Sequence, residues 1–74
     1  MKLKLLSCDA QRPDRRAIAM CLVEISSSMD EAFSNELTEI LLEGDHIEIE
    51  TEDKKSGSAF RALRKLDIDY EIVE

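Results

Sequence analysis

The chain has 74 residues, which is enough for one domain, and we place this domain at residues 1–74. This length excludes an enzyme with separate cofactor and substrate domains. Ten Lys and Arg against 17 Asp and Glu give a net charge of −7. Because this charge opposes nucleic-acid phosphates and anionic membranes, we expect neither as a partner.

The first predicted elements are a strand and a helix. Leucines alternate with lysines over residues 2–5, which is typical of a strand with one solvated face. A helix over 15–25 is expected next, since Pro13 is tolerated at a helix start and four apolar residues follow the 3.6-residue period. These four are Ile18, Cys21, Leu22 and Ile25. The unbroken apolar run over 17–23 also fits a buried strand, an alternative that periodicity alone leaves open.

A second helix is predicted to begin at a capping box formed by Ser28 and Glu31, and to end at Gly44. Its inner face is expected to carry Met29, Phe33, Leu37, Ile40 and Leu41. Its outer face is expected to carry Asp30, Glu31, Ser34, Asn35, Thr38, Glu39 and Glu43.

The remaining pattern predicts a strand, a third helix and a closing strand. Strict alternation over 46–52 indicates the strand, and Asp53 and Ser56 are candidate caps of the helix. The helix is expected to bury Ala59, Phe60, Leu63 and Leu66. Ile68, Tyr70 and Ile72 alternate with polar residues in the closing strand. The prediction is a two-layer α+β fold of order β-α-α-β-α-β, with the helices on one face of a three-stranded sheet.

This order of elements, with the runs 24–26 and 29–32, resembles the C-terminal domain of the bacterial ribosomal stalk protein of the L-seven/L-twelve type. The resemblance covers nearly the whole chain and implies the same fold. In that family the turn between the first two helices has glycines followed by a leucine-lysine-glutamate-alanine-lysine run, whose lysines help receive translation factors. The same topology is similar to the adaptor that delivers substrates to a bacterial unfolding protease.

The family's factor-binding pattern is only partly present. Met29, Glu31 and Ala32 match it, whereas serines replace the glycines, and Asp30 and Phe33 stand where lysines are expected. The family's N-terminal dimerisation region and hinge are not expected here either. We therefore expect a divergent interaction domain rather than a working stalk subunit.

The first helix carries the main candidate site. Ala19, Met20 and Val23 lie opposite its inner residues, so the helix is apolar nearly all round. Either the third helix covers this second apolar face, or the face binds another chain, including a second copy in a homodimer. With the serine turn, the predicted partner-binding residues are Ala19, Met20, Val23, Ser27 and Asp30.

Other candidate sites are less specific. Arg61, Arg64 and Lys65 share the outer face of the third helix, where a basic patch can dock an acidic partner. A small enzyme or ligand carrier is the rival hypothesis, with a pocket near His46 or Cys8. We expect no catalytic residue, metal site or cofactor, because neither His46 nor Cys8 has the neighbours that such sites use.

The predicted function is a non-catalytic protein–protein interaction module. Two cysteines are too few for the disulfide framework of a small secreted domain, and the chain has no apolar stretch of signal-peptide or membrane-spanning length. A cytoplasmic location is therefore expected.

Overall fold

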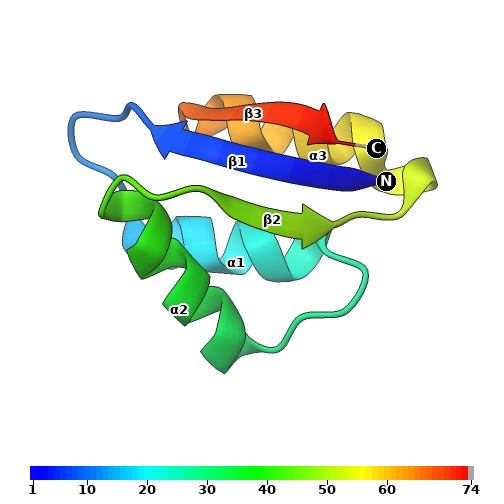
Figure 1. The fold of residues 1–74 in the computed structure, drawn as a ribbon, viewed down its shortest axis with the longest axis horizontal. Helices are drawn as coiled ribbons and strands as arrows, with labels where there is room; N and C mark the ends of the chain where they lie inside the picture. Colours follow the sequence, from blue (N-terminus) through cyan, green and yellow to red (C-terminus); the bar gives the residue numbers. More distant parts are fainter. Residues whose placement is uncertain (74) are drawn as a thin grey trace.

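The computed structural model describes residues 1–73 and has the α+β order predicted from the sequence, β-α-α-β-α-β (Figure 1). Its elements are β1 (Lys2–Cys8), α1 (Arg15–Ile25), α2 (Glu31–Leu42), β2 (Ile47–Glu50), the 3-10 turn η1 (Asp53–Lys55), α3 (Ser56–Lys65) and β3 (Ile68–Val73). Residues 15–25 are thus helical, and the strand alternative for this segment is wrong.

The three strands form an antiparallel sheet in the order β2-β1-β3, with β1 in the centre. Burial alternates along β2, where Ile47 and Ile49 are buried and the intervening glutamate is exposed. One face of the sheet is therefore covered and the other is open to solvent. On the open face Lys4 lies opposite Glu48 in β2 and Glu71 in β3, an arrangement that places opposite charges side by side.

The helices bury one hydrophobic core against the covered face. α1 contacts both α2 and α3, so it is the central helix of its layer. Figure 1 shows α1 and α3 behind the sheet. The ring of Phe60 in α3 stacks on that of Tyr70 in β3, with centroids 5.2 Å apart. The buried core residues are Leu3, Leu5, Ile18, Cys21, Leu22, Ile25, Leu37, Leu41, Ile47, Ile49, Ala59, Leu63 and Ile68.

The start of α2 differs from the predicted capping box. Its N-cap is Asp30, whose carboxylate accepts a hydrogen bond of 2.7 Å from the Phe33 amide. Ser28 precedes the cap and remains exposed. An aspartate two residues nearer the helix accepts this bond as well as a serine does, and its negative charge favours the positive end of the helix dipole.

The buried face of α2 also differs from the prediction. Phe33 is 49% exposed and Ile40 is also exposed, whereas Ser34 and Thr38, expected outside, are fully buried. α2 packs against α1 and the sheet, and small side chains suit closely packed positions of this kind. Burial of the two hydroxyls is tolerated because each donates to a carbonyl of its own helix, Ser34 to Glu31 and Thr38 to Ser34.

The C-terminal half departs from the prediction in three details. β2 ends at Glu50, although Thr51 is still buried and its amide donates to the Met1 carbonyl. α3 has no side-chain cap, because η1 leads directly into it. Ile72 lies in register with Leu3 but is half-exposed, since β3 is an edge strand with a neighbour on one side only.

Candidate functional site

The candidate site begins with the way α1 starts. Asp14 is the N-cap, and its carboxylate accepts a hydrogen bond of 3.1 Å from the Ala17 amide. The cap places Arg15 and Arg16 in the first turn, where the positive end of the helix dipole disfavours a cation. Glu24 lies in the last turn, where the negative end disfavours an anion. Arg15, Arg16 and Glu24 therefore carry charges opposite to those that stabilise an isolated helix, whereas the Asp14 carboxylate at the N-cap has the favourable sign.

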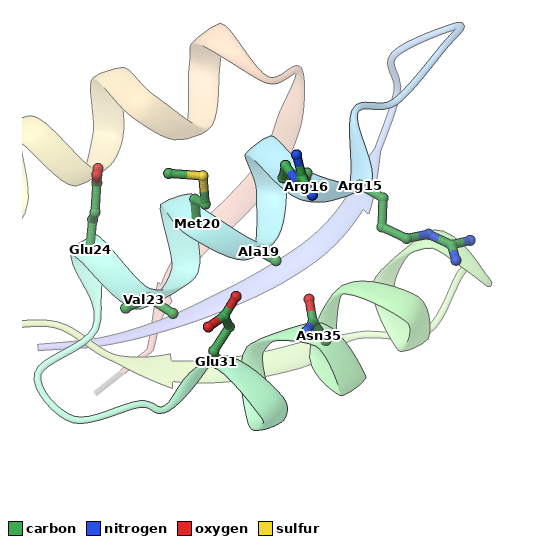
Figure 2. A pocket seen from close by; sticks show the side chains of 8 residues that line it. All are labelled: Arg15, Arg16, Ala19, Met20, Val23, Glu24, Glu31 and Asn35. Atoms are coloured by element: carbon green, nitrogen blue, oxygen red, sulfur yellow. The ribbon is translucent and has the colours of Figure 1, made fainter.

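A groove of about 700 Å³ runs between α1 and α2. Ala19 lines it and is only 5% exposed, whereas Met20 and Val23 are 59% and 37% exposed. Arg15 and Arg16 lie at one end of α1 and Glu24 lies at the other, while Glu31 of α2 faces Ala19 and Val23 across the groove (Figure 2). The complete lining is Arg15, Arg16, Ala19, Met20, Val23, Glu24, Glu31 and Asn35.

The side chains of α1 project along two rows. Figure 2 shows Arg16, Met20 and Glu24 in one row along an edge of the helix, as their spacing of four residues requires. Ala19 and Val23 point instead toward the α2 side of the groove. An apolar surface is thus bordered by a cation at one end and an anion at the other.

Some of the charged side chains that line the groove make no ion pair with other described residues. Arg15 pairs with Glu39 of α2 at 3.0 Å, an exposed contact that joins the two helices. The only other ion pair in the described part of the chain joins the N-terminal ammonium to Asp53. Arg16 and Glu24 are both exposed, and neither makes an ion pair within residues 1–73.

The structure brings together three of the five predicted partner-binding residues. Ala19, Met20 and Val23 all line the groove, although Ala19 is buried rather than exposed. Ser27 and Asp30 do not line it. The Ser27 amide instead donates to the Glu50 carbonyl at 2.9 Å, which anchors the turn to β2, and Asp30 caps α2.

The groove lining adds five residues that the sequence interpretation missed: Arg15, Arg16, Glu24, Glu31 and Asn35. The signal for the first three was present in the sequence, because their charges lie at the wrong ends of the predicted helix. The contribution of α2 could not be predicted from the sequence, since it depends on how α2 packs against α1.

The other candidate residues lie elsewhere. Arg61, Arg64 and Lys65 are exposed on α3. His46 is exposed just before β2, and the half-buried Cys8 thiol contacts the Leu66 carbonyl at 3.5 Å. Neither His46 nor Cys8 lines the α1–α2 groove or the second groove, of about 470 Å³, whose lining is Met1, Ser27, Glu50, Thr51, Glu52, Asp53 and Lys54.

Two groups within residues 1–73 have shifted pKa values. Burial, and secondarily the negative charge of Glu24, raises the pKa of the Cys21 thiol to about 11, which keeps it protonated and unreactive at neutral pH. A hydrogen bond with the carboxyl of Asp9, together with repulsion between the two acids, raises the pKa of Asp69. Neither group lines the α1–α2 groove.

Within residues 1–73, no three His, Cys, Asp or Glu side chains are arranged to hold a metal ion. None of the helices described there has the length and apolar character that a membrane span requires.

Comparison of the chain with protein-family models, with curated proteins and with solved structures finds no match in any of the three.

Proposed function

We propose that this chain is a protein-interaction module that binds another protein surface along the exposed edge of α1 and the adjoining groove, without catalysing a reaction. The observation that carries the proposal is the 59% exposure of Met20 on a helix that α2 and α3 flank on both sides. A methionine side chain adapts its shape to a partner, and a partner would cover the neighbouring Val23 as well. Burying both would gain free energy roughly in proportion to the apolar area removed from water.

The charges around the groove favour a protein partner over a small ligand. The apolar surface is open and shallow, since Met20 and Val23 remain exposed in it, whereas small-molecule sites enclose most of their ligand. Charges of both signs at its ends suit a surface that carries the complementary pair. A pocket at His46 or Cys8 has no comparable observation in its favour.

The resemblance to the ribosomal stalk C-terminal domain remains part of this proposal. The order of the elements supports it, and the partner-binding surface would lie on the same two helices that precede and follow the turn. Asp30 and Phe33 replace the lysines of that family, so a different partner is proposed. A cytoplasmic location is proposed as well, which suits the two free cysteines.

The test is photo-crosslinking in the native cells, with a photoreactive amino acid in place of Met20. A second chain carries it in place of Glu36, which is exposed on α2 and does not line the groove. The proposal predicts a discrete protein adduct from position 20 that is missing from position 36, and that Val23→Glu removes. The same adducts from both positions, or no adduct from position 20, would refute it.

A further inference from the structure

The charges on α1 point to a specific occupant of its exposed edge. Arg16 and Glu24 are each four residues from Met20, on opposite sides of it and in the same row (Figure 2). At 1.5 Å per residue, each lies about 6 Å from Met20 along the helix axis. From the N-terminal to the C-terminal end of α1, the row therefore consists of a cation, an apolar residue and an anion.

Such a row is complementary to itself when two copies lie antiparallel. A two-fold axis beside Met20 places Arg16 of one copy against Glu24 of the other, and the same contact forms twice. The two methionines meet at the axis. We propose, building on the proposed function, that the protein forms a two-fold homodimer through α1, with Arg16 paired to Glu24 of the partner copy.

The dimer explains charges that the single chain does not. Arg16 in the first turn and Glu24 in the last turn both oppose the dipole of their own helix, and neither makes an ion pair within residues 1–73. In the antiparallel pair each end of α1 lies beside the opposite end of its partner. Each disfavoured charge then has both an opposite charge and the opposite end of a helix dipole next to it.

Net charge works against any association of two copies, since each carries −7. This repulsion sharpens the test. Glu24→Arg makes the chain less negative, so a contact that depends only on net charge would strengthen. The proposed dimer predicts the reverse, because the arginine introduced by this substitution would face Arg16 of the other copy.

The experiment is sedimentation velocity of the whole chain from about 1 μM to about 1 mM, a range that covers weak and moderate dimers. The wild type is expected to shift from monomer to dimer. Arg16→Glu and Glu24→Arg are each expected to weaken the dimer about tenfold or more, because each creates two like-charge contacts. The double variant restores opposite charges at both contacts, so its dissociation constant is expected to return to within about threefold of the wild type.

Two controls separate dimer loss from misfolding. Glu36→Arg makes the same change of charge as Glu24→Arg outside the groove and is expected not to weaken the dimer. Both single variants in α1 place a charge that suits the helix dipole, so thermal unfolding of the dilute monomer is expected at an equal or higher temperature than in the wild type.

A wild type that stays monomeric throughout, or a double variant that remains as weak as the single ones, would overturn the homodimer. A monomeric wild type would leave the proposed function standing if position 20 still crosslinks to a different protein in cells. Loss of both the dimer and every specific adduct would overturn the two proposals together.

Discussion

The hydroxyl of Thr38 donates a 2.8 Å hydrogen bond to the carbonyl of Ser34, and both side chains are completely buried. The hydrophobic pattern of the sequence assigns both residues to the solvent-exposed face of α2, but the structure buries them. Because each hydroxyl is satisfied within its own helix, the cost of burying it is small.

Size rather than polarity should therefore govern substitutions at this contact. Thr38→Val keeps the volume and is expected to change the free energy of unfolding by less than about 1 kcal/mol. Ser34→Leu adds volume to a packed contact and is expected to cost about 2 kcal/mol or more. Urea unfolding measures both, with Glu36→Leu on the exposed face as the control. A larger loss from Thr38→Val than from Ser34→Leu would contradict this explanation.

The cap of α2 gives a second prediction. Asp30→Ala removes the side chain that accepts the Phe33 amide and is expected to lower the free energy of unfolding by about 1 kcal/mol. Ser28→Ala is the matched control and is expected to have little effect, because Ser28 is not the N-cap. Chemical unfolding of the two variants distinguishes them. Equal losses, or a larger loss from Ser28→Ala, would favour the capping box predicted from the sequence.

Burial of Cys21 gives a pH dependence in the alkaline range. Its pKa rises from 9.0 to about 11 in the folded chain, so the unfolded state ionises first as pH increases. The stability contributed by the neutral thiol is complete below pH 9 and is lost as pH rises to about 11. The total loss is up to about 2 to 3 kcal/mol, at about 1.36 kcal/mol per pH unit.

Other groups titrate in the same range, so the measurement is a difference between two chains. The free energy of unfolding of the wild type should fall more steeply between pH 9 and pH 11 than that of Cys21→Ala. Parallel curves for the two proteins would show that Cys21 ionises equally readily in the folded and unfolded states.

Two left-handed backbone positions give opposite predictions. Asp67 follows α3 with a φ of 58°, and Gly44 follows α2 with a φ of 101°. Asp67→Gly relieves the strain of an L side chain there and is expected to raise stability by up to about 1 kcal/mol. Gly44→Ala is expected to lower it by about 1 kcal/mol through backbone strain alone, because an added Cβ at Gly44 meets no atom within 4 Å. Thermal unfolding tests both, and changes of the same sign would refute the argument.

The fold was largely predictable because hydrophobic period and element order are local properties of the chain. Alternating leucines in β1 and the spacing of Ile18 and Leu22 in α1 specify which face of each element is buried. Phe33 and Ile40 were misassigned because their exposure depends on which side of α2 packs against α1 and the sheet, which no local period encodes.

The candidate site was predictable only in its apolar part. Met20 and Val23 follow from an α1 that is apolar nearly all round, and the structure places both in the groove. Glu31 and Asn35 lie on α2. They could not be assigned to the site from the sequence, because their place in the groove depends on how α2 packs against α1. The cap at Asp30 was missed because Ser28 and Asp30 are both good capping residues.

The central claim is that a protein surface covers the exposed edge of α1, and methionine methyl NMR tests it most directly. The chain has three methionines, of which Met1 and Met29 are half-buried and Met20 is largely exposed. Methyl-labelled protein is compared as a dilute solution in buffer, as a concentrated solution in buffer and in concentrated extract of the native cells. We predict that, relative to the dilute solution, the Met20 signal shifts or broadens at high concentration or in extract while the Met1 and Met29 signals do not, and that Val23→Glu removes the change. A Met20 signal that stays as sharp and unmoved at high protein concentration and in extract as in dilute solution would contradict the claim.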